Sequence, residues 1–238
     1  MLEIQNLSKK FKDHKVIDML NTTFSEIGVS VIVGGNGSGK TTLLHMITHL
    51  LQPDTGQILL DGLQPSNIAY KSKFFYLPSD FYLPHYMTGK EYTKFVLSRY
   101  AASNYDHLVW LLELLDMTTS QNKMLESYSF GMKKKIQIAA AVAANTDYIF
   151  ADEILGGLDF ETVLLVQAIF AKISQRKKII LVSHDQNTID CFPEDIRVMR
   201  QGKLIPFTGS PYELTTFIKQ DGVLRDKLCD VEKYFSTS

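Results

Sequence analysis

The 238-residue sequence predicts an α/β fold with a mixed or parallel sheet, an N-terminal antiparallel β subdomain and an inserted α-helical subdomain. Continuous apolar runs at 148–151 and 179–182 are typical of strands buried on both faces of a parallel sheet. Alternating runs at 2–5 and 16–20 favour antiparallel strands. Between about residues 88 and 145, apolar residues recur at helical spacing, which predicts the insert.

The N-terminal strand group includes a turn and a third strand. Turn-forming residues at 12–15 separate the two alternating runs, so we expect the chain to reverse there. Residues 57–60 form another β-rich run and lead into Asp61-Gly62, which is typical of a turn after a strand.

A glycine-rich segment follows a strand predicted at 29–33 and precedes a helix expected from near Thr41. It matches the pattern G-x-x-x-x-G-K-[ST] of a P-loop, in which glycines let backbone N–H groups surround phosphate oxygens at the positive end of a helix. We therefore expect it to bind a nucleoside triphosphate; the alternative is a simple glycine-rich turn. Lys40 would reach the β- and γ-phosphates, and the Thr41 hydroxyl would coordinate Mg²⁺. The segment comprises Gly34, Gly35, Asn36, Gly37, Ser38, Gly39, Lys40, Thr41 and Thr42.

The helical insert begins with a capping signal. Thr88 and Glu91 have the Thr-x-x-Glu form of a capping box, and the helical pattern continues through Leu97 and again over 107–115. The length fits a single domain. We expect residues 1–79 and 145–238 to form the nucleotide-binding core with its β subdomain, and residues 80–144 to form the helical subdomain.

Two of the apolar runs end in polar side chains. Asp152 and Glu153 follow the run at 148–151, and an acid at the carboxyl end of a parallel strand lies beside the ligand crevice of an α/β sheet. We expect Asp152 to hold Mg²⁺ through water and Glu153 to polarise the attacking water. His184 ends another strand of that sheet and is expected to face the γ-phosphate. The alternatives are a solvated acidic turn and a structural histidine.

Composition excludes some classes of protein. The net charge of −1 gives no overall electrostatic attraction to nucleic acid. Cys191 and Cys229 are expected to be reduced and buried. The first residues lack a signal peptide, and the longest apolar run, 138–144, is far shorter than the ~20 residues that cross a bilayer. We expect a cytosolic polypeptide that reaches a membrane only through a partner.

Taken together, these segments resemble the nucleotide-binding subunit of an ATP-binding cassette (ABC) transporter over nearly the whole chain. Residues 128–132, Tyr-Ser-Phe-Gly-Met, resemble the family signature L-S-G-G-Q in a form similar to that of exporter-type cassettes. The resemblance implies that Ser129 and Gly131 bind the nucleotide, with Ser129 capping a helix and bonding the γ-phosphate. Lys134 and Lys135, which follow, are expected on a solvated helix face.

Other segments carry the same resemblance. Residues 155–159 resemble the D-loop, which crosses between two cassettes, and His184 matches the switch histidine. Residues 202–214 are similar to the turn and helix that close such cassettes. Phe11 lies where the family usually carries an aromatic that stacks on adenine, with core packing at a strand end as the alternative.

The resemblance departs from the family pattern at the Q-loop. Ser79 occupies the place of the usual Gln or Glu. Its hydroxyl can contact Mg²⁺ or water but has a shorter reach, and Asp80 is the alternative. Hydrolysis is therefore implied more strongly than coupling to a partner.

The resemblance implies a composite site with ATP and Mg²⁺ as cofactors. One chain supplies the P-loop, the two acids and His184, and a second chain, identical or paralogous, supplies Ser129 and Gly131. Head-to-tail dimerisation would then depend on ATP. A separate membrane-spanning subunit is the implied partner, and nucleic acid is not. Of the aromatic residues between 74 and 86, we expect Phe81, Tyr82 and Tyr86 to contact it, while the others fill the junction between subdomains.

The expected function is ATP hydrolysis that drives export of a peptide, antibiotic or lipid-like substrate from the cytoplasmic face of the membrane. The substrate is recognised by the membrane subunit, so this sequence does not name it. One alternative is a soluble, non-transport ABC ATPase that acts on ribosomes or DNA, although such proteins usually carry two cassettes or long coiled-coil inserts. Another is a module that holds ATP without turnover, against which Glu153 and His184 argue.

Overall fold

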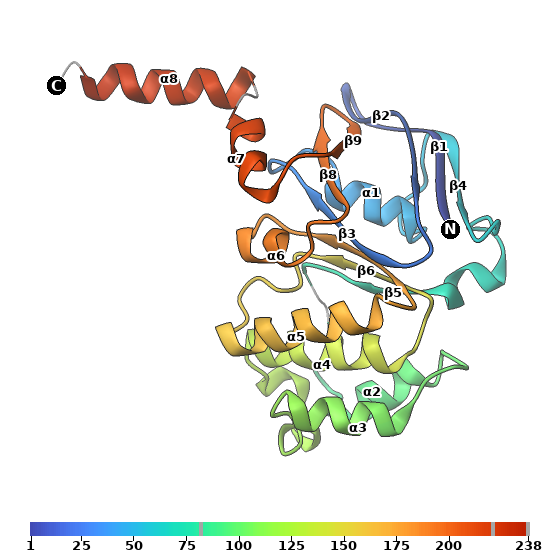
Figure 1. Ribbon diagram of the computed structural model, residues 1–238. Coiled ribbons are helices and arrows are strands. Elements are labelled where there is room, and N and C mark those ends of the chain that lie inside the picture. Colours follow the sequence, from blue (N-terminus) through green and yellow to red (C-terminus); the bar gives the residue numbers. More distant parts are fainter. Residues whose placement is uncertain (81–82, 220–221, 237–238) are drawn as a thin grey trace.

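A computed structural model describes residues 1–80, 83–219 and 222–236 of the chain. Figure 1 shows a small N-terminal sheet and a larger sheet, with helix α1 on one side of the larger sheet and helices α4 and α5 on the other. The predicted α/β class, the antiparallel strand group and the inserted helices are confirmed.

The N-terminal sheet is antiparallel, with strand order β2-β1-β4. Leu2 of the central strand pairs with Phe24 on one side and with Leu60 on the other. The chain reverses at Lys12-Asp13, where the sequence predicts a turn. Its strands are β1 (Leu2–Phe11), β2 (His14–Phe24) and β4 (Thr55–Leu60).

The larger sheet has the order β5-β6-β7-β3-β8-β9 and is parallel except for β9, which runs antiparallel to β8. Strands β6 and β7 are buried along their whole length, as their continuous apolar runs predict. The carboxyl ends of β3, β6 and β7 therefore share one edge of the sheet. The strands are β3 (Gly28–Val33), β5 (Phe74–Leu77), β6 (Tyr148–Asp152), β7 (Lys178–Val182), β8 (Ile196–Arg200) and β9 (Lys203–Phe207).

The helices complete the layers. The predicted capping box is confirmed at α2, where the Thr88 hydroxyl accepts a bond from the backbone N–H of Glu91 and the Glu91 carboxylate accepts one from that of Thr88. The helix α8 extends away from the rest of the molecule (Figure 1). The α-helices are α1 (Lys40–Ile47), α2 (Gly89–Leu97), α3 (Tyr105–Leu114), α4 (Phe130–Ala143), α5 (Phe160–Ile173), α6 (Gln186–Cys191), α7 (Pro211–Lys219) and α8 (Gly222–Ser236). The short 3-10 helices are η1 (Ile68–Lys73), η2 (Ser120–Asn122) and η3 (Leu125–Ser127).

Two hydrophobic clusters cover the two faces of the larger sheet. One joins the N-terminal sheet and α1 to the sheet through residues such as Leu43 and Phe150. The other packs α2 to α5 against the opposite face through residues such as Ile136 and Phe170. The larger sheet is thus enclosed between apolar layers, and polar side chains gather at its two ends, the carboxyl end being the one where ligands bind in such sheets.

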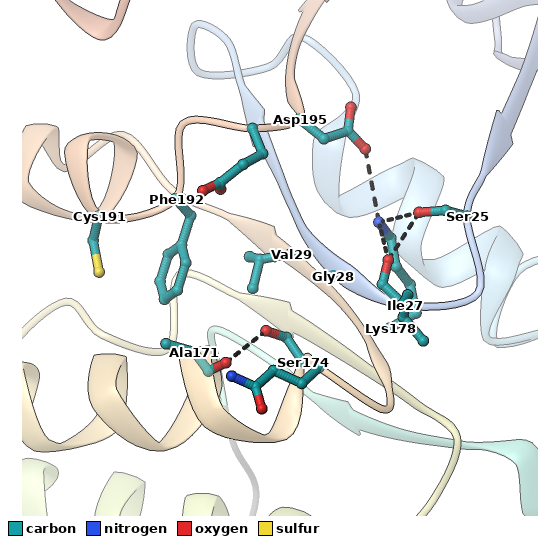
Figure 2. Close-up of a pocket in the computed structure, with 12 residues that line it drawn as sticks. Ser25, Ile27, Gly28, Val29, Ala171, Ser174, Lys178, Cys191, Phe192 and Asp195 are labelled. Atoms are coloured by element: carbon teal, nitrogen blue, oxygen red, sulfur yellow. Dashed lines mark hydrogen bonds and ion pairs between the residues drawn. The ribbon is translucent and has the colours of Figure 1, made fainter.

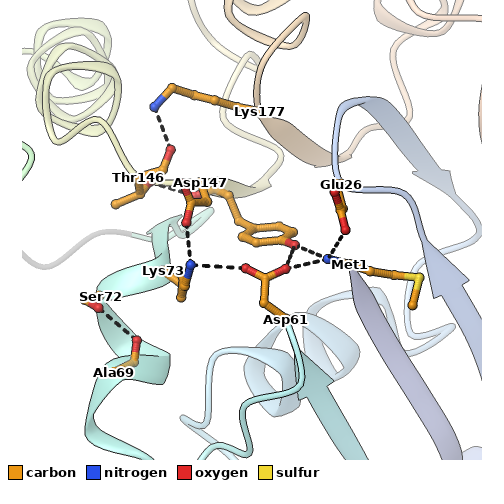
Figure 3. A network of polar contacts seen from close by, with 10 residues as sticks. Met1, Glu26, Asp61, Ala69, Ser72, Lys73, Thr146, Asp147 and Lys177 are labelled. Carbon is orange, nitrogen blue, oxygen red and sulfur yellow. Dashed lines mark hydrogen bonds and ion pairs between the residues drawn. The ribbon is translucent and has the colours of Figure 1, made fainter.

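A polar network fixes the amino end of β6 to the β4 turn (Figure 3). The Tyr148 hydroxyl donates to the Asp61 carboxylate at 2.6 Å, and the Lys73 ammonium lies 3.3 Å from Asp61 and 2.8 Å from Asp147. The Met1 amine also donates to Tyr148 Oη, at 2.7 Å. These contacts join the N-terminal sheet, η1 and the larger sheet at the end opposite the predicted nucleotide site.

The prediction that both cysteines are buried is wrong, since Cys191 and Cys229 are exposed. The short helix α6 buries Thr188 and Ile189, so Cys191 lies on a different face, at the rim of a hollow of about 530 Å³ at the amino end of the sheet (Figure 2). Across the part of the chain that the structure describes, no helix has the length and apolar character needed to cross a membrane.

Candidate nucleotide-binding site

The P-loop connects the end of β3 to the start of α1. Gly37 and Gly39 have φ angles of 77° and 103°, in the left-handed region that favours glycine. A Cβ at Gly34 would lie 2.5 Å from the carbonyl oxygen of Met199, so a side chain does not fit there. The chain needs glycine at these positions to turn sharply beside β8 and enter α1, whose first N–H groups face the loop.

The Lys40 ammonium lies within this loop. The residue is 7% exposed, and its Nζ donates to the carbonyl oxygens of Gly34 at 2.7 Å and Gly35 at 3.0 Å. Burial lowers the pKa of Lys40, while the nearby carboxylates of Glu153 and Asp152 counteract part of that effect. The loop therefore holds a partly desolvated cation, which attracts an anion more strongly than one in open solvent.

A hollow of about 390 Å³ opens beside the loop. Apolar side chains line one part of the hollow and the P-loop lines the other. A nucleotide requires both, because its base packs on apolar groups and its triphosphate binds polar ones. The Ser38 hydroxyl is buried without a hydrogen-bond partner among the described residues, so it can serve a phosphate oxygen. These features fit ATP. The lining residues are Phe11, Val16, Asn36, Gly37, Ser38, Gly39, Lys40, Thr41, Thr42 and Glu153.

Phe11 lies at the end of β1 and is 46% exposed, so it does not pack in the core. Its ring borders the hollow, and the Lys9 ammonium lies 5.6 Å from the ring centre. The geometry is compatible with the stacking role and not with the core-packing alternative.

Thr41 and Asp152 meet at the carboxyl edge of the sheet, where the Thr41 hydroxyl donates to the Asp152 carboxylate at 2.7 Å. Asp152 is 1% exposed, and burial raises its pKa against the opposing effect of the Thr41 hydrogen bond. A hydroxyl and a carboxylate are hard oxygen donors of the kind that Mg²⁺ takes together with substrate phosphates. Such a pair leaves the remaining metal ligands to phosphate and water. Among the described residues, no cluster of three or more His, Cys, Asp or Glu is placed to hold a metal ion.

Ser79, the third predicted metal ligand, follows β5 and is half-buried. No hydrogen bond in the described part of the chain links it to Thr41 or Asp152. A further polar group near Asp152 is Tyr76, which the sequence does not indicate: its hydroxyl is buried without a partner among the described residues, and its pKa is raised by burial and by the Asp152 charge. Its position depends on the pairing of β5 with β6, where it lies opposite Phe150.

Glu153 lines the hollow, and His184 lies beside it. His184 Nδ1 is 3.3 Å from a Glu153 carboxylate oxygen, and both side chains are accessible to water. Glu153 has a φ of 49°, a left-handed conformation that costs a non-glycine residue roughly 1–3 kcal/mol. The surrounding contacts therefore fix the backbone at Glu153, and its carboxylate borders the hollow, where it can polarise a water.

The signature segment is separate from this hollow. Ser129 is exposed and caps α4 by accepting a bond from the backbone N–H of Met132 at 3.2 Å. The described residues that line the hollow include neither Ser129 nor Gly131. The structure thus brings together the P-loop, both acids and His184, while the start of α4 remains accessible to another molecule.

The prediction of a solvated face for Lys134 and Lys135 is wrong. Lys134 is 2% exposed and donates to backbone carbonyls at 153 and 156, while Lys135 lies 3.6 Å from the Asp159 carboxylate. The loop that follows β6 packs against this side of α4 and covers both lysines, a contact between segments that helical spacing does not reveal.

The structure tests only part of the prediction for the aromatic residues between 74 and 86, and Phe74, which packs in the cluster with α1 and not at the junction with the helical region, departs from it. Phe75 is buried and stacks on Tyr100 of the helical region, with ring centres 5.5 Å apart. Tyr86 is exposed and free to contact a partner. Phe81 and Tyr82, the other predicted contacts, lie outside the described residues.

The burial of Asp152 predicts opposite effects on stability and on function. Asp152→Asn keeps an acceptor for Thr41 and removes a desolvated charge, so we expect a nucleotide-free chain that is more stable by about 1 kcal/mol but no longer stabilised by Mg²⁺ together with ATP. Because burial raises the pKa of Asp152, the folded state binds this proton more tightly than the unfolded chain, and wild-type stability falls as pH rises through that pKa. The gain in stability from Asp152→Asn should therefore be largest at pH values above the pKa of Asp152. Thermal melts across pH check this, and a variant that melts below the wild type at neutral pH contradicts it.

Comparison with known proteins identifies relatives of this chain. The sequence profile of the family described as ABC transporter matches residues 17–156. The chain is 31% identical over 222 residues to the energy-coupling factor transporter ATP-binding protein EcfA2 of Staphylococcus aureus (strain USA300), covering 84% of this chain and 75% of the relative. It is 26% identical over 224 residues to the petrobactin import ATP-binding protein YclP of Bacillus subtilis (strain 168), covering 90% of this chain and 88% of YclP.

Two solved structures share the fold. An ATP-binding subunit of an ABC transporter superposes with a TM-score of 0.83 at 21% identity, over 96% of this chain and 99% of its own. The ATP-binding cassette MJ0796, solved as a dimer in a post-hydrolysis state with ADP and Pi, gives a TM-score of 0.77 at 22% identity, over 86% of this chain and 96% of its own. At these identities, the likeness shows the fold.

Proposed function

This chain belongs to the ABC transporter family as an ATP-binding subunit and ATPase, and from that premise we propose that two copies enclose ATP head to tail and drive a separate membrane-spanning subunit. The observation that supports the proposal is that Ser129 is exposed and does not line the hollow. Lys40 and Glu153 line the hollow, whereas Ser129 lies at the start of α4. The binding site for a γ-phosphate in the hollow of one copy is completed by the signature segment of the other copy.

In this arrangement the nucleotide holds the dimer together. ATP contacts both surfaces at once and favours the closed pair, whereas cleavage of the γ-phosphate removes the bridging contacts and lets the copies separate. The MJ0796 cassette, which shares the fold, is dimeric in its structure with ADP and Pi. A paralogous cassette in place of the second copy would give the same geometry.

The roles of the residues follow from their positions. The P-loop backbone, Ser38 and Lys40 bind the phosphates, and Phe11 stacks on the base. Thr41 and Asp152 would hold Mg²⁺, which would supply positive charge against the phosphates. Glu153 orients and polarises the attacking water, and His184 positions the Glu153 carboxylate and the γ-phosphate. Ser79, after β5, is a metal or water contact that would sense the nucleotide for the membrane partner.

Each transport direction has one supporting observation. The relatives, which match most of the chain, are named for petrobactin import and for an energy-coupling factor transporter, and the first of these names favours import. The form of the signature at 128–132 favours export of a peptide, antibiotic or lipid-like substrate, but it involves five residues only. Import therefore has the broader support, and export is the second candidate. The non-transport alternative, on ribosomes or DNA, is not favoured by these relatives.

Purification from membranes tests the proposal. A tagged chain should co-purify with a polytopic subunit on the cytoplasmic face of the membrane, and the pair should hydrolyse ATP. Ribosomal proteins in place of that subunit would refute a transport role. After reconstitution into vesicles, substrate added on the cassette side should stimulate hydrolysis if the direction is export. Substrate added on the opposite side should do so if it is import.

A further inference from the structure

Lys134 connects the helix that begins at Ser129 to the loop that carries Glu153. We infer that Lys134 is a positioning residue that couples the two nucleotide sites of the dimer, so that closure of α4 on the partner's triphosphate adjusts Glu153 at its own site. The inference rests on the proposed head-to-tail arrangement, in which Ser129 and Glu153 of one copy serve different nucleotides.

The contacts of Lys134 are internal and specific. Its Nζ donates to the carbonyl oxygen of Glu153 at 2.9 Å and to that of Gly156 at 2.5 Å. The backbone N–H of Gly156 also donates to the Glu153 carbonyl, at 3.2 Å, which closes the loop into a turn. The ammonium therefore holds both ends of this turn, directly at the backbone of the residue whose carboxylate polarises water.

The Lys134 charge is costly to bury, because its hydrogen bonds go to neutral carbonyl oxygens and not to a carboxylate. Burial lowers the pKa of Lys134, and the Glu153 charge counteracts this effect. The ammonium therefore interacts with the Glu153 loop both through its hydrogen bonds to the backbone and through its charge. Glu153 also has a left-handed backbone, a conformation that persists only where its surroundings fix it.

The start of α4 contacts the same loop through a second side chain. A Cβ added at Gly157 would lie 2.8 Å from the Phe130 ring, so the ring packs directly on the loop backbone. The Lys134 ammonium lies 4.8 Å from the centre of that ring. Signature segment and loop therefore form one packed unit, and a movement of α4 reaches the Glu153 backbone through Lys134.

Lys178 provides a matched control at the opposite end of the same sheet. It is 1% exposed, and its Nζ donates to Ser25 Oγ at 3.1 Å and to the carbonyl oxygen of Ile27 at 3.4 Å (Figure 2). Asp195, 3.7 Å away, keeps its bond from Arg197 when Lys178 is changed. Lys178→Met thus removes an equally buried ammonium without approaching the nucleotide site.

The test compares Lys134→Met and Lys178→Met by ATPase kinetics, at a temperature well below both melting points. For Lys134→Met we expect kcat to fall about 10- to 100-fold and the Hill coefficient for ATP to approach 1, with the affinity of single copies for ATP unchanged. Lys178→Met should keep both kinetic values within about twofold of the wild type. Lys134→Arg, which preserves the cation and its donors, should recover most of kcat and cooperativity.

Each outcome decides the inference. If Lys134→Met keeps wild-type kcat and Hill coefficient, Lys134 does not couple the sites. If each methionine variant loses activity in proportion to the fall in its melting temperature, Lys134 has only a structural role. If Lys134→Met fails to fold, the test uses Lys134→Arg instead. A folded Lys134→Arg variant with low, non-cooperative turnover refutes the inference. A wild-type protein that neither dimerises with ATP nor hydrolyses it cooperatively refutes the proposed function itself.

Discussion

Replacing Lys40 with alanine is expected to weaken ATP binding by about 100-fold, close to 3 kcal/mol, and to abolish hydrolysis. The reason is the place of the ammonium, which bonds the carbonyls of Gly34 and Gly35 inside the P-loop and is largely shielded from water. A triphosphate in the hollow would exchange those neutral carbonyls for anionic oxygens, and charge-assisted hydrogen bonds are about twice as strong as neutral ones. Alanine offers no donor in that position.

Titration of nucleotide into the purified variant measures the affinity directly, and a melting curve checks that the protein is folded. Burial of the Lys40 charge is itself unfavourable. We therefore expect the free energy of unfolding of the nucleotide-free variant to lie no more than about 1 kcal/mol below that of the wild type. Lys172→Ala, on the exposed last turn of α5, is the control for loss of one positive charge. Wild-type affinity in Lys40→Ala would refute the assignment of the hollow to the triphosphate.

The parts of the site that the sequence predicts well are local in the chain. The P-loop connects a strand directly to a helix, and its glycines indicate the left-handed backbone angles that such a turn requires. Asp152 and Glu153 are predicted because the apolar run before them identifies a buried parallel strand, whose carboxyl end faces the crevice. In each case, the residues that determine the geometry lie within a few positions of the functional side chain.

The features that the sequence does not reveal depend on packing between distant segments. Lys134 looks like a solvated helix residue until the loop after β6 is placed against α4. Tyr76 becomes a candidate of the metal site only when β5 is paired with β6. Helical and strand periodicity distinguish the buried face of an element from the exposed one, but they do not say which loop covers a given charge.

The expectation of export illustrates a different limit. It depends on a five-residue form of the signature, whereas the relatives that match most of the chain are named for import and for energy-coupling factor transport. The signature segment contacts nucleotide in the proposed dimer, and the nucleotide is the same in either direction. Phe81 and Tyr82, which we expect to contact the membrane subunit, lie outside the described residues, so the structure adds nothing on direction from that surface.

Replacing Glu153 with glutamine is expected to lower kcat by roughly 10²–10⁴-fold while ATP binding persists. Glutamine has nearly the same shape, so the P-loop, Lys40 and the Thr41–Asp152 pair still bind the nucleotide and Mg²⁺. The amide does not accept a proton from water, so cleavage stops before the step that separates the two copies. The variant should therefore accumulate as a dimer in the presence of Mg-ATP.

Size-exclusion chromatography with light scattering separates the alternatives, since a head-to-tail dimer with two trapped nucleotides has twice the mass of the free chain. Glu113→Gln, an exposed acid on α3, should remain active and return to monomer as ATP is consumed. Adding Ser129→Ala to Glu153→Gln should weaken the dimer, because a cap and a γ-phosphate contact are lost together from the partner surface. A Glu153→Gln chain that binds Mg-ATP and stays monomeric would show that one copy alone surrounds the nucleotide, contrary to the exposed position of Ser129 outside the hollow.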